Sequence, residues 1–475
     1  MTKSNKRLTI LLLVLFMIGA IALPAFALPK QAFDNKVVKR ISIDHAWGHL
    51  EYLAEEIGPR ATGSTQEKAA AQYLANVFES YGYQTTLQEF NLPTNVIVPE
   101  VKVIAPVEYQ LFPAPITQTA LTLGGGVTGQ IVDWGNSLTP PNDASGKIAL
   151  MDSATNATRS TNYTTYRTAA MDAGATGIII VQKSLNPTSL GGRVHTPTSA
   201  IPIIIVSNEQ GDAIRNSLVT GETIVNIKLE TQKTSYNVVA TRKPQNAKKQ
   251  TGKALIIGGH YDSVYGAPGA NDNASSIAAM LEVARVIADY PIGMEVRFIA
   301  FGGEERGFLG SYAYVNSLSP SERAQVVGMI NMEMLGSAYE PVEFMFAATS
   351  NGINNLMIDS VIDAGSRISK TVQWGGRVGS SDHVPFQNAG IPAIVYARAY
   401  PGSMPWGGGN GLEAWYHTPF DTIDRMSKER LEEATLILGA ATYEILRPDT
   451  PNLKRSAIRR EIDFPEVHYL VDEIQ

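Results

Sequence analysis

The chain of 475 residues contains no cysteine. Disulfide bonds, thiolate nucleophiles and cysteine-based zinc or iron–sulfur sites are therefore excluded, so any metal must be held by histidine, aspartate and glutamate. Charged residues make up only 18% of the chain, its net charge is −6, and it has no long basic run. Because phosphate binding needs clustered positive charge, no nucleic-acid partner is expected. The hydrophobic share of 44% is ordinary for a globular protein and excludes a disordered chain.

The apolar run at the start of the chain, Leu8–Leu23, is shorter than the ~20 residues that a helix needs to span a bilayer. It follows three basic residues and precedes Ala25–Ala27, a small-residue pattern that signal peptidase accepts. We expect residues 1–27 to be a cleaved signal peptide and the protein to be secreted, with no stable membrane insertion after cleavage. An uncleaved membrane anchor is the alternative.

The segment 101–235 differs from the rest of the chain in composition and in the length of its apolar runs. Its charges are sparse, Thr, Pro and Gly are common, and short strand-like runs surround one helical piece. This pattern predicts a separate, mostly β module. The module resembles the protease-associated (PA) domain in the segments Gly146–Leu150, Ala173–Ile180 and Ile201–Ile204.

Regular alternation of strands and helices is found on both sides of this module, in residues 28–100 and 236–449. The pattern predicts one discontinuous α/β domain, with a mostly parallel sheet covered by helices. Residues 450–475 are expected to form a C-terminal tail whose role the sequence does not indicate.

Metal-capable side chains of the α/β domain fall just after predicted strands. The strand Ala254–Gly258 is followed by His260, the strand Glu295–Phe301 by two glutamates, and the strand Gln325–Met332 by Glu333. Because such loops meet at the carboxyl edge of a parallel sheet, we expect their side chains to converge. Two imidazoles with at least three carboxylates suit two divalent ions of the zinc or manganese kind. The full set of candidates is His260, Asp262, Asp272, Glu304, Glu305, Glu333 and His417.

Six motifs occur in the order found in the M28 family of co-catalytic zinc peptidases, which includes secreted bacterial aminopeptidases. They are Gly259–Ser263, Gly269–Ser275, Phe301–Gly307, Asn331–Gly336, Ser381–Phe386 and Tyr416–Pro419. Any one of these motifs is weak evidence, but six in the family order are specific. The chain therefore resembles this family over about residues 47–89 and 237–446.

The resemblance implies two zinc ions and the residues that hold them. Asp272 would bridge both ions. His260 and Glu333 would complete one site, and Glu305 and His417 would complete the other.

The resemblance also implies three catalytic roles. Glu304 would be the general base that takes a proton from a water shared by the two ions, and would then deliver it to the leaving amine. Asp262 would orient the ring of His260. Tyr416 would help to stabilise the tetrahedral intermediate.

Two positions depart from the family pattern. The family usually has Asp where this chain has Glu333, so the metal position or the identity of the ion could differ. Many relatives carry an arginine in the segment that here reads Gly379–His383. Arg377 is close enough in sequence to replace it, and we expect it to bind substrate.

The remaining histidines carry weaker expectations. His383 is left outside the metal set, as a supporting or structural residue. His45 and His49 have helical spacing but lack the acidic partner of metalloprotease helices, and we interpret them as surface residues.

These features predict a secreted zinc aminopeptidase acting on peptides with a free N-terminus. A carboxypeptidase or dipeptidase on the same scaffold is the nearest alternative. A non-catalytic binding protein with a decayed site is an alternative from another class, although every ligand position keeps a competent side chain. The preferred N-terminal residue, the role of the module and the oligomeric state stay open.

Overall fold

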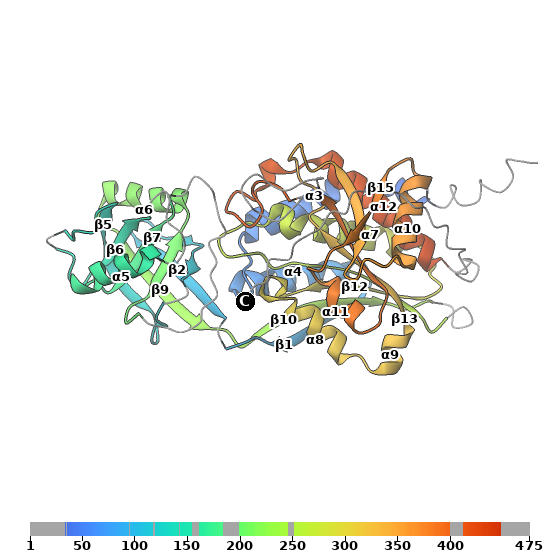
Figure 1. The fold of residues 1–475 in the computed structure, drawn as a ribbon, viewed down its shortest axis with the longest axis horizontal. Coiled ribbons are helices and arrows are strands. Elements are labelled where there is room, and N and C mark those ends of the chain that lie inside the picture. The colour runs from blue at the N-terminus through green and yellow to red at the C-terminus, as the bar shows by residue number, and fades with distance from the viewer. Residues whose placement is uncertain are drawn as a thin grey trace, which may run out of the picture.

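The computed structural model describes residues 34, 36–94, 96–116, 119–141, 143–153, 161–183, 199–245, 251–399 and 412–447. The predicted signal peptide and the C-terminal tail lie outside these residues. No helix in the described part is long and apolar enough to cross a membrane. The chain forms a larger and a smaller lobe (Figure 1), and each lobe is built on an eight-stranded sheet.

The sheet of the larger lobe is mixed, with a parallel centre. Its strands, in spatial order, are β1 (Gln84–Asn91), β10 (Thr234–Arg242), β12 (Glu295–Phe301), β11 (Ala254–His260), β13 (Val326–Glu333), β16 (Ala393–Ala399), β14 (Phe344–Thr349) and β15 (Val372–Arg377). The four central strands, β12, β11, β13 and β16, run parallel to one another. Strands β10 and β14 join this centre in the antiparallel direction. The expected fold, a mostly parallel α/β sheet covered by helices, is confirmed.

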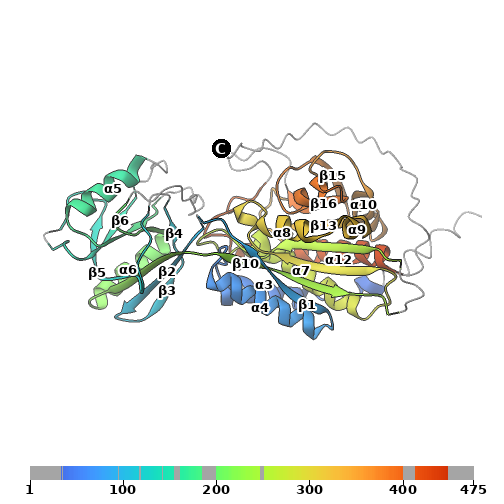
Figure 2. The same cartoon turned by 90° about the horizontal axis from the view of Figure 1, so that it is seen from below.

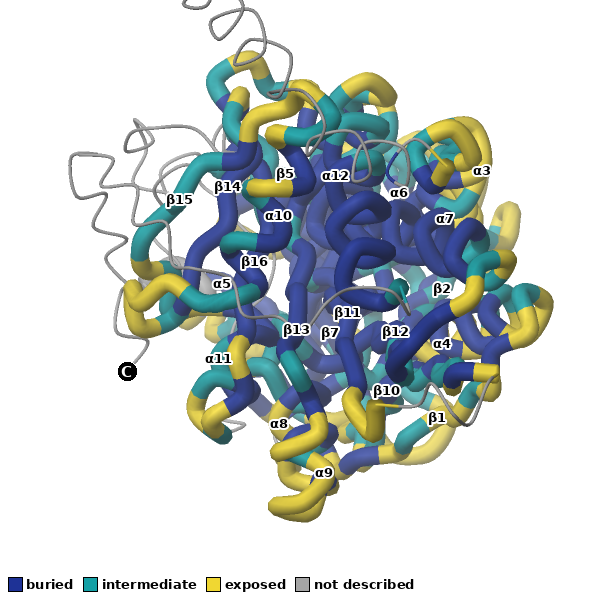
Figure 3. Tube along the Cα trace, turned by 90° about the vertical axis from the view of Figure 1, so that its right-hand side faces the viewer, coloured by how far each residue is buried: buried dark blue, intermediate teal, exposed yellow. Residues whose placement is uncertain are grey.

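Helices cover both faces of this sheet because its central strands bury side chains on both sides. Leu255 and Ile257 pack in the cluster that contains residues of α3, α4, α7, α10 and α12, whereas Ile256 packs with residues of α8 and α11. This alternation follows from the two-residue repeat of a strand. Figure 3 shows β11, β13 and α7 as buried elements at the centre of the lobe. The helix bounds are α3 (Ile43–Glu51), α4 (Thr65–Ser80), α7 (Ser276–Ala288), α8 (Leu309–Ser317), α9 (Pro320–Gln325), α10 (Leu356–Arg367), α11 (His383–Asn388) and α12 (Lys428–Leu446).

The smaller lobe has its own sheet and its own cores. Its strands, in spatial order, are β3 (Tyr109–Leu111), β2 (Ile97–Ala105), β9 (Ile224–Thr231), β5 (Val127–Gly135), β6 (Ile148–Asp152), β7 (Gly177–Val181), β8 (Ile203–Val206) and β4 (Ala114–Pro115). Strands β5 to β8 run parallel. Residues of α5 (Thr161–Asp172) pack in one core, and Ile214 of α6 (Asn208–Thr220) packs in the other. The lobe therefore contains a second helix, α6, in addition to the one that was expected.

In the described part of the chain, two crossings join the lobes, from β1 to β2 and from β9 to β10. Figure 2 shows β2 and β10 near the waist between the lobes. The domain boundaries that we expected at residues 100 and 235 fall inside β2 and β10, respectively. A further contact is made by Tyr265 of the larger lobe, which is buried within the apolar cluster of the smaller lobe and donates a hydrogen bond to the carbonyl of Ile97.

Candidate active site and metal centre

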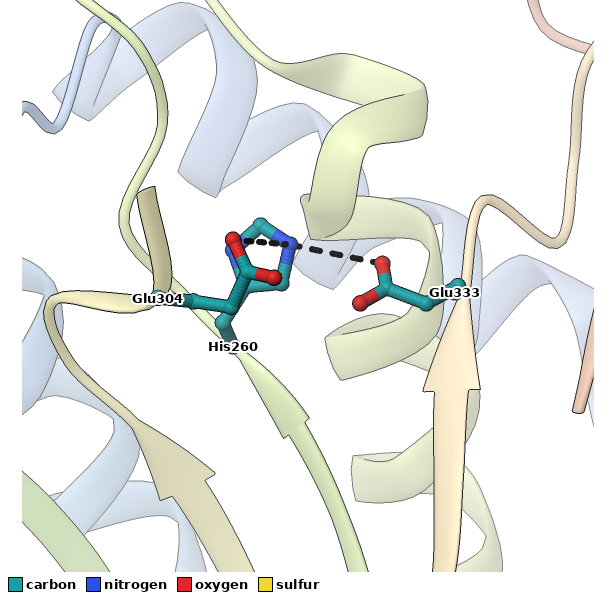
Figure 4. Close-up of side chains that lie close together, drawn as sticks. All are labelled: His260, Glu304 and Glu333. Atoms are coloured by element: carbon teal, nitrogen blue, oxygen red, sulfur yellow. Dashed lines mark ion pairs between the residues drawn. The ribbon is translucent and has the colours of Figure 1, made fainter. Parts of the chain in front are cut away.

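Three parallel neighbouring strands bring one histidine and two glutamates together. His260 is the last residue of β11, Glu333 is the last residue of β13, and Glu304 lies in a short turn just after β12. The Nε2 atom of His260 is 3.3 Å from Oε2 of Glu333 and 4.0 Å from Oε2 of Glu304. Figure 4 shows both carboxylates directed toward the imidazole. The predicted convergence at the carboxyl edge of the sheet is therefore present.

A single carboxylate lies between the two imidazoles of the site. The Oδ1 atom of Asp272 is 3.2 Å from Nε2 of His260, and its Oδ2 atom is 3.1 Å from Nε2 of His417. The same nitrogen of His417 is 3.2 Å from Oε2 of Glu305. Two groups of donors thus share Asp272: His260 and Glu333 on one side, and Glu305 and His417 on the other.

These residues fit a zinc centre in donor type and in spacing. Imidazole nitrogen and carboxylate oxygen are ligands that zinc accepts at ~2.0–2.2 Å, which puts two ligand atoms on one tetrahedral ion about 3.3 Å apart. The nitrogen–oxygen separations of 3.1–3.3 Å are close to that value. The Oε1 atom of Glu305 is also buried without a hydrogen-bond partner among the described residues, which leaves a donor atom free for a cation.

The charges of the site also favour a cation. Burial lowers the pKa of His260, but the negative charges of Glu333 and Glu304 outweigh burial and hold this pKa well above its usual value. His417 shows the same balance, with Glu305 and Asp272 raising its pKa. Burial and the neighbouring carboxylates raise the pKa of Glu304. Carboxylate charge therefore exceeds the positive charge that the two imidazoles can supply, a condition that divalent ions would relieve.

Asp262 contacts the site differently from the expected pattern. Its backbone carbonyl oxygen is 3.0 Å from Nδ1 of His260, whereas its carboxylate oxygen is 3.6 Å away. The carboxylate accepts backbone N–H groups from Glu304 at 3.1 Å and Glu305 at 3.4 Å, and the hydroxyl of Thr62 at 2.7 Å. The backbone of Asp262 thus faces the histidine, and its side chain holds the two glutamates.

Asp421 and Ser381 support the site, although the sequence pattern did not single them out. Asp421 accepts the backbone N–H groups of Asn271 at 2.7 Å and of Asp272 at 2.9 Å. Ser381 donates to the carboxylate of Glu333 and accepts from the side chain of Asn331 at 2.7 Å. Both residues lie in or just after the matching motifs, so their positions in the sequence were the available signal.

The other predicted residues have varied environments. The ring of Tyr416 stacks on the ring of His417 with centroids 3.7 Å apart, and burial raises the pKa of Tyr416 well above its usual value. Arg377 is exposed at the end of β15 and donates to the carbonyl of Ser350 at 3.1 Å. Among the described residues it has no hydrogen bond or ion pair with the metal-site residues, and its binding to substrate stays a prediction.

The histidines outside the metal set are of two kinds. His383 is fully buried with Nε2 2.8 Å from the carbonyl of Val378, and burial lowers its pKa to about 4. His45 is exposed, as expected. His49 is half-buried, and its two ring nitrogens lie 2.6 and 3.0 Å from the hydroxyls of Tyr73 and Tyr81. Tyr73 lies within α4 and Tyr81 caps its C-terminal end. Helical periodicity alone did not indicate that His49 would contact these two tyrosines.

Comparison with known proteins decides the family. Residues 237–442 match Peptidase family M28, and residues 127–214 match the PA domain. Aminopeptidase YwaD of Bacillus subtilis is 31% identical over 463 residues, which cover 94% of this chain and 95% of that protein. The chain belongs to peptidase family M28. The predicted resemblance to this family and to the PA domain is confirmed, and the chain is a metallopeptidase.

Solved structures of M28 relatives agree with this assignment. The chain is similar to the zinc aminopeptidase BSAP from Bacillus subtilis, with a TM-score of 0.59 and 32% identity over 86% of this chain and 96% of that one. It is also similar to an aminopeptidase from Aneurinibacillus sp. strain AM-1, with a TM-score of 0.57 and 31% identity over 92% of this chain and all of the relative. Both the fold and a zinc-dependent chemistry are thus shared with M28 peptidases.

Proposed function

We propose that the protein is a secreted aminopeptidase that uses two zinc ions to remove N-terminal residues from peptides. The observation that carries this proposal is the placement of Asp272 between His260 and His417, at 3.2 and 3.1 Å. The relatives that match most of the chain are aminopeptidases, and one of them is a zinc enzyme. Export is inferred from the pattern in residues 1–27.

The residues of this chain can be assigned to the steps of peptide hydrolysis. Bound zinc would supply electrophilic polarisation of the scissile carbonyl and would lower the pKa of the attacking water. Glu304 would take a proton from that water and transfer it to the departing amine, a task that suits a carboxylate with a raised pKa. Tyr416 keeps its hydroxyl proton because its pKa is raised, and this hydroxyl would donate a hydrogen bond to the carbonyl oxygen that becomes negative in the tetrahedral intermediate.

The charge of the site favours a substrate with a free amino group. Within residues 251–399 and 412–447, no lysine or arginine forms an ion pair with the carboxylates of Asp272, Glu304, Glu305 or Glu333. A carboxypeptidase needs a positively charged side chain that receives the carboxylate of its substrate, and these described residues place none against the metal-site carboxylates. This lack of a receiving cation supports exopeptidase action at the N-terminus over action at the C-terminus.

Hydrolysis of matched blocked and unblocked substrates tests this function. The purified chain would be assayed with leucine p-nitroanilide, its N-acetyl form, and a dipeptide and a longer peptide, each with and without a chelator. We expect release only from substrates with a free N-terminus, and loss of release with the chelator. Cleavage of the acetylated peptide from its C-terminus would favour a carboxypeptidase, cleavage of the dipeptide alone would favour a dipeptidase, and no hydrolysis with zinc present would favour the binding protein.

A further inference from the structure

One arginine that lies outside the segment matched to family M28 is fully buried and contacts the loop that joins two of the proposed metal ligands. Arg60 has no exposed surface and follows the turn at Gly58 and Pro59, between the helical turns that end at Ile57 and helix α4. Its side chain donates five hydrogen bonds, and every acceptor is a backbone carbonyl. The acceptors are Tyr261 at 2.9 Å, Leu53 at 2.8 Å, Gly58 at 2.9 Å, Pro268 at 2.6 Å and Gly269 at 3.0 Å.

Three of these carbonyls belong to one loop, residues 261–271, which connects His260 to Asp272. The guanidinium contacts this loop both at its start, at Tyr261, and near its end, at Pro268 and Gly269. It therefore fixes the two ends of the loop relative to each other. The spacing of these ends determines how closely the imidazole of His260 and the carboxylate of Asp272 approach.

The backbone of the same N-terminal segment adds further contacts to the loop. The N–H of Arg60 donates to Oγ of Ser263 at 3.0 Å, and the N–H of Ser263 donates to the carbonyl of Arg60 at 3.2 Å. Ala61 pairs with Ser263 in an isolated β-bridge. Close by, Thr62 bonds the carboxylate of Asp262, which in turn holds the backbone of Glu304. The segment thus reaches both the loop between two ligands and the turn that carries the general base.

The positive charge of Arg60 interacts with the carboxylates in and around the metal centre. A buried guanidinium is costly unless opposite charge and hydrogen bonds compensate for it. The compensating charges are the carboxylates of the site, with Asp421 and Asp262 first among them, yet none of the five hydrogen bonds goes to a carboxylate. The arginine therefore offsets negative charge without occupying the oxygens that would bind metal.

We propose that Arg60 is a positioning residue of the metal centre, which sets the spacing of His260 and Asp272 by binding both ends of the loop that joins them. This inference rests on the proposed function in that zinc is taken as the ion. Lysine cannot replace the contact, because its donors radiate from one nitrogen and cannot reach carbonyls on several sides of a planar fork. The segment Gly58–Thr62 then completes a catalytic lobe whose matched family region begins only at residue 237.

The zinc affinity of the metal-free protein tests the proposal. We would measure zinc binding to the full chain by competition with a chromophoric chelator, alongside the urea midpoint of the metal-free form. The variant Arg60→Lys keeps the positive charge and is compared with Arg242→Lys. Arg242 also donates to two carbonyls of the same lobe, those of Ile287 at 3.1 Å and Tyr290 at 2.9 Å, at the amino-terminal edge of the parallel strands.

We expect Arg60→Lys to lower zinc affinity by about 10- to 100-fold, the range found for residues that orient metal ligands, and Arg242→Lys to leave it within about twofold. Zinc affinity of Arg60→Lys equal to that of the wild type overturns the proposal, even where its urea midpoint falls. A wild-type chain that binds no zinc overturns the proposed function as well. If Arg60→Lys does not fold, Ser263→Ala decides, because it removes the side-chain link between the same segment and loop; unchanged zinc affinity in that variant also overturns the proposal.

Discussion

The two sheets of the molecule end in acidic side chains at corresponding edges, but they neutralise this charge in different ways. In the smaller lobe, Asp133 lies near the carboxyl end of β5 and Asp152 ends β6. Arg215 of α6 binds both, at 2.9 and 2.6 Å, and Lys183 lies 3.9 Å from Asp152. The acids of this edge are therefore paired with cations that the chain itself provides.

In the described part of the larger lobe, no lysine or arginine forms an ion pair with the metal-site acids at the same edge of the parallel strands. These acids face two imidazoles. The guanidinium of Arg60, described above, donates its hydrogen bonds to backbone carbonyls rather than to the acids. Both sheets have parallel central strands that are buried on both faces. They differ at the carboxyl edge in which groups neutralise the acidic side chains. The comparison teaches that a metal centre is recognised by acidic residues whose cations are missing, rather than by the number of acidic residues at the strand ends.

The largest effect is expected from Glu304→Gln, which removes the proton acceptor of the larger lobe and keeps the size of the side chain. Turnover should fall by about 10²- to 10⁴-fold, the usual contribution of a general base, while zinc stays bound. Steady-state kinetics with a free-amino substrate, together with zinc analysis of the same sample, measures both quantities. Turnover within tenfold of the wild type would remove Glu304 from the mechanism.

A second prediction uses His383, which is buried in the same lobe without the acids that surround His260 and His417. Its pKa is about 4 in the folded chain, against about 6.5 when unfolded. The unfolded chain binds the extra proton between these values, so stability is present above pH 6.5 and is lost as the pH falls toward 4. The loss from this group is on the order of 3 kcal/mol.

Urea unfolding of the wild type and of His383→Gln at several pH values between 4 and 7 measures this loss. The variant should show a smaller decrease in the free energy of unfolding toward pH 4, whereas His45→Gln, at an exposed position, should follow the wild type. Parallel curves for the wild type and His383→Gln would show that burial does not depress the pKa of this histidine.

The smallest effect is expected in the smaller lobe, from Arg215→Met. This change leaves Asp133 and Asp152 without their shared cation, and we expect the free energy of unfolding of that lobe to fall by about 1–3 kcal/mol. Because all five proposed metal ligands lie in the larger lobe, we expect kcat to stay within about twofold of the wild type. A loss of activity as large as that of Glu304→Gln would mean that the two edges are not functionally distinct.

The regular parts of the fold could be predicted because their residues repeat with the period of the element. The strand Glu295–Phe301 has the predicted bounds because turn-forming residues flank it. Strands β14 and β15 and helices α6 and α10 were missed, because short apolar runs and mixed helical faces are weak local signals. Tertiary packing, rather than local pattern, determines these elements.

The site divides in a similar way. His260, Glu305 and Glu333 could be predicted because they lie at or just after the ends of strands, whereas the roles of Asp272 and His417 were implied by the motifs shared with family M28. The structure brings all five together. Arg60 could not be predicted, because its function depends on contacts with backbone groups far away in the chain, and Tyr261 is 201 positions from Arg60. Hydrogen bonds to carbonyls leave no pattern in the residues that supply them, so only the folded structure identifies such partners.

Zinc content is the most direct test of the contrast between the two edges. The wild-type chain, Asp272→Asn and Asp152→Asn would each be loaded with zinc, dialysed against metal-free buffer and analysed for zinc per chain. We predict about two zinc ions for the wild type and for Asp152→Asn, whose acid belongs to the paired edge, and fewer than one for Asp272→Asn. Equal zinc content in Asp272→Asn and the wild type, or no retained zinc in the wild type, would contradict the account.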